Sequence, residues 1–257
     1  MEKSNPIIVI PSRLSATRLP NKPLLLINNL PMIVQVVNRA LESKIHNILV
    51  ASADSQINEV IKQYFKDNSR VDVVLTDPTL SSGTDRIKQA LDIYDKNKQF
   101  NMVINVQGDL PTISQNAISQ CYELLQKDYV DIATLVAEIE KKEDNHNSNI
   151  VKAVLSFSES KDIAKALYFS RSYVPYNAIT TYHHIGIYGY RRNILDKFTS
   201  LAPSNLEIVE KLEQLRALEN NINIYAKITT DIPFGVDVYE DLAKAELILK
   251  NIHINSL

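Results

Sequence analysis

The chain has little glycine, one cysteine and no long apolar run. These shortages limit the classes of protein to which it can belong. Its 257 residues include only 5 glycines, where average usage gives roughly 18. The single cysteine, Cys121, excludes an internal disulfide and fits a reducing compartment. No apolar run approaches the roughly 18–20 residues of a membrane span, and residues 1–10 lack the pattern of a signal peptide. We therefore expect a cytoplasmic protein with no membrane partner.

A large net charge and two common nucleotide motifs are also missing. The formal charge of −2 argues against the basic face that nucleic-acid binding needs, so we expect no nucleic-acid partner. Neither GxxxxGK[ST] nor GxGxxG occurs, which excludes Walker-type NTPases and dehydrogenases with the dinucleotide fingerprint. The hydrophobic share of 45% is that of a globular protein with a real core.

Buried strands and amphipathic helices alternate over the first 110 residues. Such alternation predicts right-handed βαβ units and a parallel sheet. The expected strands are Ile7–Ile10, Asn47–Ala51, Val71–Leu75 and Met102–Val106, and the expected helices are Pro31–Ser43, Ser55–Phe65, Gly83–Tyr94 and Ser114–Leu125. The sequence therefore predicts an α/β fold.

The pattern changes after Asp131, where strands predominate. A charged, Asn-rich stretch, Glu140–Asn149, reads as a solvated loop between two of them. The expected strands are Ile132–Glu138, Ile150–Phe157, His184–Tyr190 and Asn223–Ile228, and the expected helices are Asn205–Glu219 and Tyr239–Lys250. No repeat or linker divides the chain, so we expect one domain over residues 1–257 that carries a smaller β-rich lobe.

The loop after the first strand carries a cluster of cations. Arg13, Arg18 and Lys22 lie in it, and no acidic residue occurs between Lys3 and Leu41. Ligands of parallel α/β sheets bind beyond the carboxyl ends of the strands, where this loop must lie. A triphosphate needs several cations to neutralise it. The loop is either a triphosphate site or a basic stretch of surface.

Two carboxylates follow glycines in similar surroundings. Asp109 ends the buried stretch VINVQGD, and Asp237 ends PFGVD. Asp109 would emerge at the ligand edge, where a divalent metal could bridge it to phosphate oxygens. Asp237 could share that metal only if the fold brings the two together. Asp54 is a further candidate, but its position favours a helix N-cap; Ser114 is expected to cap the helix that follows Asp109.

The segment Ser81–Arg86 opens a helix with small, hydrogen-bonding residues that suit an anion or a base edge. Arg86 lies in the first turn of that helix, where the dipole disfavours a cation, which hints at a role outside helix stability.

Period-two spacing places His184, Gly186, Tyr188 and Tyr190 on one face of their strand, so the neighbouring His183 points away, which argues against a His-His metal pair. A lone histidine of this kind is more often structural, although His184 and Tyr188 could also present polar groups to a sugar.

In the helix expected at Asn205–Glu219, Glu213 and Arg216 fall inside the apolar arc. Either they form an ion pair there or Glu213 faces a polar cavity.

Together these segments resemble the CMP-KDO synthetases, the 3-deoxy-manno-octulosonate cytidylyltransferases. The resemblance runs from residue 7 to about 245 in the family's order, through IPSRLSATRLPNKPL, SSGTDR, NVQGDLP, YFSRSYVPY, HHIGIYGYR, LEIVEKLEQLR and FGVDVYEDL. It implies a Rossmann-like, mostly parallel sheet of the nucleotide-diphospho-sugar transferase type, a homodimer, and a reaction of CTP with an acidic eight-carbon sugar that feeds lipopolysaccharide assembly.

The resemblance also implies a role for each matching residue. Arg13 and Lys22 would hold the triphosphate, Asp109 and Asp237 would hold Mg²⁺, and Ser82 and Gly83 would lie near the nucleotide. The residues implied to face the sugar acid are Arg86, Gln107, His184, Tyr188, Glu213 and Gln214. Arg13, Lys22, Asp109 and Asp237 form the implied catalytic set.

The chain departs from the family pattern at a few positions. Asn21 stands where Gly is usual, Leu110 where Glu is usual and Val238 where Thr is common. Two other readings remain open: a cytidylyltransferase for another acid sugar, such as a sialic acid or an amino variant, and a nucleotide-binding homologue that has lost turnover.

Overall fold

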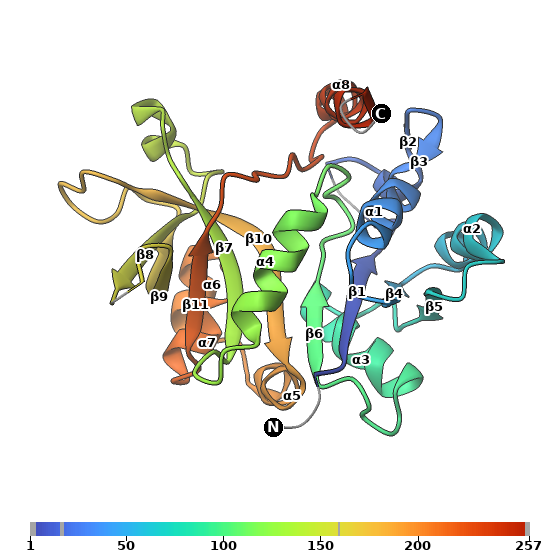
Figure 1. Cartoon of the computed structure of the whole chain (residues 1–257), viewed down its shortest axis with the longest axis horizontal. Coiled ribbons are helices and arrows are strands. Elements are labelled where there is room, and N and C mark those ends of the chain that lie inside the picture. Colours follow the sequence, from blue (N-terminus) through green and yellow to red (C-terminus); the bar gives the residue numbers. More distant parts are fainter. Residues whose placement is uncertain (1–3, 16–17, 159, 255–257) are drawn as a thin grey trace. The chain divides into compact units, whose positions relative to one another are not determined.

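The computed structural model of the chain describes residues 4–15, 18–158 and 160–254, except for the side chains of Lys142 and His253. It contains two compact units: the first unit is Met1–Ile118 with Pro233–Leu257, and the second unit is Ser119–Ile232. Helix α4 (Gln115–Leu125) carries the chain from the first unit into the second (Figure 1). The single domain expected over residues 1–257 stays a prediction.

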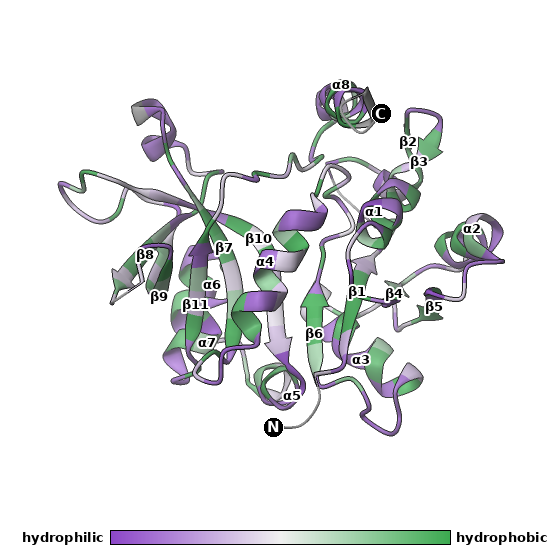
Figure 2. Cartoon of the chain, viewed as in Figure 1, coloured by the Kyte–Doolittle hydropathy of each residue, from purple (hydrophilic) through white to green (hydrophobic). Residues whose placement is uncertain are grey.

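The first unit is built on parallel strands in the order β5-β4-β1-β6. Ile8 on β1 pairs with Ile48 on one side and Ile104 on the other. All of residues 7–10 are fully buried, as expected of a strand covered on both faces, and Figure 2 colours β1 and β6 as hydrophobic. The strands are β1 (Pro6–Ser12), β4 (Asn47–Ser52), β5 (Val71–Leu75) and β6 (Met102–Asn105).

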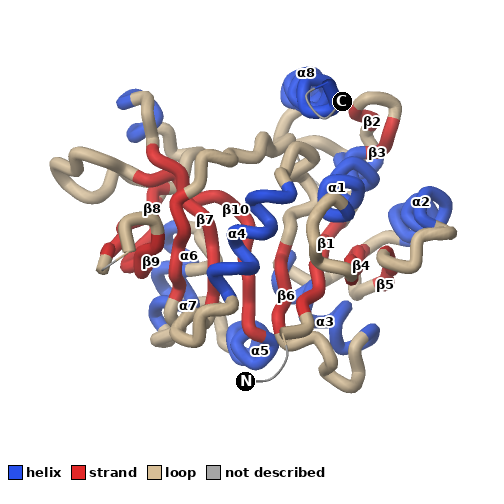
Figure 3. The backbone as a smooth tube through the Cα atoms, in the orientation of Figure 1, coloured by secondary structure: helices blue, strands red, loops and turns tan. Residues whose placement is uncertain are grey.

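Helices alternate with these strands, as the sequence predicts (Figure 3). They are α1 (Met32–Leu41), α2 (Ser55–Phe65), α3 (Gly83–Tyr94) and, from the C-terminal segment, α8 (Tyr239–Ile254). The side chains of α1 that follow helical spacing, such as Ile33, Val37 and Ala40, are fully buried. Ser114 caps α4 by accepting the amide N–H of Ala117 at 2.9 Å, which confirms its expected role.

A small hairpin, β2 (Leu26–Ile27) with β3 (Leu30–Pro31), precedes α1. Its two-residue turn is Asn28-Asn29, and both have positive φ, as such tight turns require. Side chains from the hairpin region and α8 share one apolar cluster that includes Leu19, Val236 and Leu249. This cluster seats the C-terminal segment against the end of the cationic loop.

The second unit has strands in the order β10-β7-β11-β9-β8, and β8 also pairs with β10. Among the strands described for this unit, β7 and β11 run parallel and the other pairings are antiparallel. The strands are β7 (Ile132–Glu138), β8 (Lys152–Phe157), β9 (Ile163–Ser170), β10 (Tyr182–Arg191) and β11 (Ile224–Ile228). This unit also contains the 3₁₀ turn η2 (Lys142–His146), which lies in the expected loop, helix α5 (Arg192–Ser200) and two short helices described below.

The α/β class is therefore confirmed, but the expectation of a mostly parallel sheet is wrong. The strands of the chain form a mixed arrangement, parallel in the first unit and largely antiparallel in the second. The physical reason lies in the connections: β8 and β9 follow one another through a short loop, which joins antiparallel neighbours, whereas parallel neighbours need a long crossover.

The long helix expected at Asn205–Glu219 is also wrong. Two short helices, α6 (Asn205–Glu210) and α7 (Leu215–Glu219), flank Lys211, whose φ of 56° is left-handed. The break lets Arg216 reach back to Glu207, with its Nε and Nη2 at 2.8 and 2.6 Å from the two carboxylate oxygens. In an unbroken helix nine residues rise about 13 Å, which would keep these side chains apart.

Candidate active site

The cationic loop begins where β1 ends. The amide N–H of Leu14 donates to Asp54 Oδ2 at 2.8 Å, so this carboxylate secures the loop. Asp54 occupies the N-cap position of α2, but its side chain makes no capping bond there, and the expected capping role is wrong. Near the end of the loop Asn21 has φ 57°, a left-handed conformation that explains why asparagine can stand where glycine is usual. Ala16 and Thr17 of the IPSRLSATR motif lie outside the described residues.

Asp109 is placed by a close approach between two backbone segments. A Cβ added at Gly108 would lie 2.7 Å from the carbonyl oxygen of Pro11, so only glycine fits there without a shift. The turn Gln107-Gly108-Asp109 therefore lies directly against the end of β1. As a result, the Asp109 carboxylate lies beside the cationic loop, at the carboxyl end of β6.

Asp237 reaches the same place from the far end of the sequence. The amide N–H of Val236 donates to the carbonyl of Asp109 at 3.0 Å, and the amide N–H of Phe234 donates to Thr112 Oγ1 at 2.7 Å. A Cβ added at Gly235 would lie 3.3 Å from Leu110 Cδ2, so the leucine that replaces the family's usual glutamate lies close to this segment. These contacts place the two carboxylates in one site.

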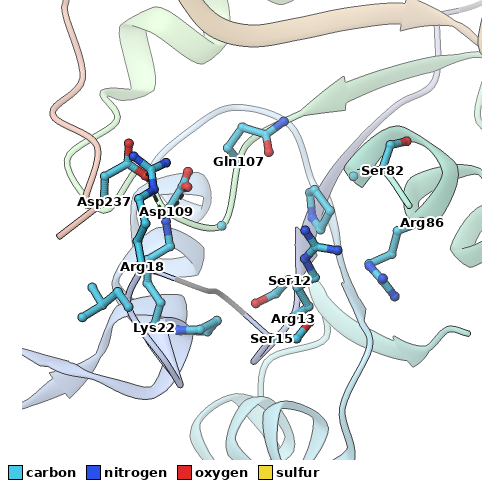
Figure 4. A pocket seen from close by; sticks show the side chains of 15 residues that line it. Ser12, Arg13, Ser15, Arg18, Lys22, Ser82, Arg86, Gln107, Asp109 and Asp237 are labelled. Carbon is cyan, nitrogen blue, oxygen red and sulfur yellow. Dashed lines mark hydrogen bonds and ion pairs between the residues drawn. The ribbon is translucent and has the colours of Figure 1, made fainter. Parts of the chain in front are cut away.

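Lys22 links the two carboxylates. Its Nζ lies 2.8 Å from Asp109 Oδ2, 2.8 Å from the carbonyl oxygen of Val236 and 3.5 Å from Asp237 Oδ1. Arg18 adds a second cation, with Nη2 at 3.2 Å from Asp237 Oδ1. The condition that the sequence analysis set, that the fold must bring these two distant carboxylates together beside the cationic loop, is met (Figure 4).

These residues line a cavity of about 350 Å³ that lies wholly within the first unit. Its walls include every residue of this unit to which the resemblance assigns a role, but not Asp54: Arg13, Lys22, Ser82, Gly83, Arg86, Gln107, Asp109 and Asp237. Arg13 and Arg18 are exposed, which leaves the mouth of the cavity cationic. Such a cavity at the ends of parallel strands suits an anionic ligand.

Ser82 and Arg86 are both held by the protein itself. Ser82 caps α3 by accepting the amide N–H of Asp85 and donating to its carboxylate. Arg86 is only 2% exposed and donates to Thr76 Oγ1 at 2.7 Å and to the carbonyl of Asp77 at 3.0 Å. Burial lowers the pKa of this guanidinium, and the nearby Arg13 lowers it further. Arg86 therefore fixes the segment before α3 as well as lining the cavity.

Ser12 is a cavity residue that the sequence did not single out. It is 6% exposed, and its buried Oγ has no hydrogen-bond partner among the described residues. An unsatisfied buried hydroxyl costs stability, and its place on the cavity wall leaves this one available to hydrogen-bond a ligand. The signal available in the sequence was its position as the last residue of the first strand, directly before Arg13.

The donor set fits a magnesium ion that is shared with a phosphate ligand. Mg²⁺ is usually held by one or two carboxylates together with substrate phosphates rather than by an all-protein cage. Asp109 and Asp237 supply two carboxylates, and no cluster of three or more His, Cys, Asp or Glu side chains with metal-binding geometry occurs in the described part of the chain.

The other four candidates, His184, Tyr188, Glu213 and Gln214, belong to the second unit. The rings of His184 and Tyr188 lie 5.3 Å apart, and His184 Nε2 lies 3.0 Å from Thr134 Oγ1. Burial raises the pKa of the Tyr188 hydroxyl well above its ordinary value, and the nearby Glu213 carboxylate raises it further. Glu213 Oε1 is 3.9 Å from Arg216, whose closer partner is Glu207. Gln214 is 8% exposed. The shared face of His184 and Tyr188 expected from the sequence is confirmed.

His184 gives the second unit a pH-dependent stability. Burial lowers its pKa from 6.5 to about 3. Between these values the unfolded chain takes up a proton that the folded chain refuses, so stability is full above pH 6.5 and declines as the pH falls. We expect His184→Gln to make the loss between pH 6.5 and 5 shallower by up to about 1.4 kcal/mol per pH unit, measured by urea unfolding. His46→Gln, at an exposed position, is the control, and equal slopes in wild type and His184→Gln would contradict this assignment.

No helix in the described part of the chain has the length and apolar character to cross a bilayer.

Comparison with known proteins agrees with the geometry. The cytidylyltransferase family matches residues 7–228. A 3-deoxy-manno-octulosonate cytidylyltransferase of Rhodospirillum rubrum is 46% identical over 245 residues, which is 95% of each chain. The corresponding protein of Paramagnetospirillum magneticum is 42% identical over 250 residues, 97% of this chain and 100% of that one.

Comparison with solved structures also finds cytidylyltransferases. A CMP:2-keto-3-deoxy-manno-octonic acid synthetase complexed with CTP superposes with a TM-score of 0.86 at 31% identity, over 97% of this chain and 100% of that one. A cytidylyltransferase from Leptospira borgpetersenii superposes with a TM-score of 0.60 at 14% identity, which shows the fold alone.

A cationic loop and two carboxylates at the ends of parallel strands, on this fold, define a nucleotidyltransferase. The chain belongs to the cytidylyltransferase family and, within it, to the 3-deoxy-manno-octulosonate cytidylyltransferases.

Proposed function

We propose that the protein activates 3-deoxy-manno-octulosonate with CTP, giving CMP-KDO and pyrophosphate. The observation that carries the proposal is the meeting of Asp109 and Asp237 at Lys22 in a cavity with a cationic mouth. The match over 95% of the chain to a 3-deoxy-manno-octulosonate cytidylyltransferase, and over 97% of it to a synthetase solved with CTP, supports CTP and 3-deoxy-manno-octulosonate as the substrates.

The reaction needs placement and charge neutralisation more than covalent chemistry by the protein. The anomeric 2-hydroxyl oxygen of the sugar attacks the α-phosphorus of CTP, and the bond from that phosphorus to the bridging oxygen breaks. Pyrophosphate leaves with the bond's electron pair, and the hydroxyl proton is released. The protein's task is to hold two anionic substrates together in line.

The residues of the first unit receive the nucleotide. Arg13 and Lys22 hold the triphosphate, and Ser82 and Gly83 lie near the nucleotide at the start of α3. Asp109 and Asp237 hold Mg²⁺, which when bound supplies positive charge to the phosphate oxygens. The supporting observation is that both carboxylates and the cationic loop line one cavity.

For the sugar acid we propose contacts in each unit by itself: Arg86 and Gln107 in the first unit, and His184, Tyr188, Glu213 and Gln214 in the second. Arg86 keeps a cation in the cavity wall, where the sugar's carboxylate must approach an already anionic nucleotide. The grouping of His184, Tyr188 and Glu213 within their own unit supports a common polar ligand for these three.

Turnover with a panel of acid sugars tests the substrate. With CTP and Mg²⁺, we expect pyrophosphate release to be fastest with 3-deoxy-manno-octulosonate and at least about tenfold slower with a sialic acid or an amino variant, since a site built for one set of hydroxyls leaves polar groups unpaired with another. Faster release with another sugar would identify that sugar as the substrate. Release with none of them would favour a nucleotide-binding homologue without turnover.

The proposal extends to the protein's setting. We place the enzyme in the cytoplasm as a homodimer, with its product consumed in lipopolysaccharide assembly. These three features rest on the family resemblance, whereas the names of the relatives state the reaction alone.

A further inference from the structure

Lys22 already has three oxygen neighbours within the protein. A lysine ammonium has three N–H donors, and the neighbours of Nζ are Asp109 Oδ2, the carbonyl oxygen of Val236 and Asp237 Oδ1 at 2.8, 2.8 and 3.5 Å. The Lys22 side chain is only 14% exposed, whereas those of Asp109 and Asp237 are 38% and 55% exposed. The ammonium therefore sits beneath the two carboxylates, on the protein side of the site.

This position creates a conflict with the roles proposed for these residues. A divalent cation held by Asp109 and Asp237 would share their oxygens with a positive charge already in contact with Asp109. A phosphate held by Lys22 would have to draw the same ammonium away from its three acceptors. Arg18 repeats the arrangement at the surface, since its Nη2 lies 3.2 Å from Asp237 Oδ1.

We propose that Lys22, assisted by Arg18, acts as a latch that neutralises the two carboxylates until a polyphosphate arrives. The triphosphate attracts Lys22 and Arg18 and so frees Asp109 and Asp237 for the divalent cation. Each ligand then raises the affinity for the other, as reciprocal coupling requires. The latch rests on the metal assignment of the proposed function and adds to it the prediction that the metal alone binds weakly.

Binding of Mn²⁺ to the nucleotide-free protein tests the latch without any turnover. Free Mn²⁺ is followed by its electron paramagnetic resonance signal as protein is added. Removal of one positive charge within about 4 Å of a divalent cation favours its binding, so we expect Lys22→Met to bind Mn²⁺ at least about tenfold more tightly than wild type. Unchanged or weaker binding by Lys22→Met would overturn the latch, because it would make Lys22 a support of the metal site or a bystander.

Two further variants keep the test decisive. Arg18 is 65% exposed, so Arg18→Gln does not threaten folding, and we expect it to tighten Mn²⁺ binding by about two- to threefold because exposed charges are screened. If Lys22→Met does not fold, Arg18→Gln alone decides, and binding no tighter than wild type overturns the proposal. Lys66→Met, at a position 75% exposed on α2's far end, is the matched control and should leave binding unchanged.

The failure of the latch can be told from the failure of the metal site. Asp109→Asn and Asp237→Asn should each weaken Mn²⁺ binding in the Lys22→Met background. If they do not, the metal assignment itself is wrong. If they do, yet Lys22→Met binds no more tightly than wild type, only the latch is wrong.

Discussion

Asp109→Asn and Asp237→Asn are each expected to reduce turnover by at least about a thousandfold, because each would remove half of the anionic donor set proposed to hold the divalent cation. Asparagine preserves the shape of aspartate, and both side chains are partly exposed, so the fold should survive. Pyrophosphate release with CTP and 3-deoxy-manno-octulosonate at saturating Mg²⁺ measures the loss.

The control for these variants is Asp67→Asn, whose side chain is 88% exposed and does not line the cavity. It should retain wild-type rates. Near-normal turnover by either Asp109→Asn or Asp237→Asn would show that the carboxylate pair does not hold the metal, and the proposed arrangement of the site would fail.

Gly108→Ala is expected to damage both the site and the fold. Its Cβ would lie 2.7 Å from the carbonyl oxygen of Pro11, a contact with backbone that can be relieved only if the turn or the end of β1 moves. A shift of this turn carries Asp109 with it, and misplacement on the order of 1 Å costs about a hundredfold in kcat/KM. Overpacking should also lower the free energy of unfolding by about 1–3 kcal/mol, measured by denaturant unfolding.

Gly186→Ala provides the control for stability. An added Cβ there meets no atom of the described chain within 4 Å, so the same change of residue should leave the midpoint of unfolding nearly unchanged. Equal stability of the two variants would mean that the turn at Gly108 yields freely and that glycine is not required to place Asp109.

The sequence predicts the first unit well because its local signals agree with one another. Ile7–Ile10 is a continuous apolar run, and a strand buried on both faces is what such a run forms. The cationic loop and Asp109 follow strands whose carboxyl ends meet at one edge, so their proximity also follows from the pattern. The sequence could not predict that Asp237 lies beside Asp109; it showed only that the fold would have to bring them together. Hydrogen bonds of the neighbouring Val236 and Phe234 hold Asp237 there.

Features that depend on long-range contacts could not be predicted from the sequence. The helix breaks at Lys211, and the break allows Arg216 to form an ion pair with Glu207. The periodicity of apolar residues in the sequence does not indicate such an ion pair. Asp54 has the position of an N-cap, yet its carboxylate accepts a hydrogen bond from the amide N–H of Leu14 in the cationic loop. Strand direction in the second unit was missed for the same reason, since period two identifies a strand without naming its neighbours.

The most direct test of the account is to locate the metal in crystals of the protein grown with CTP and Mn²⁺. Anomalous diffraction should place a Mn²⁺ peak within bonding distance of carboxylate oxygens of both Asp109 and Asp237 and of the nucleotide's phosphates. A peak that contacts neither carboxylate, or phosphates bound away from Arg13 and Lys22, would contradict the account.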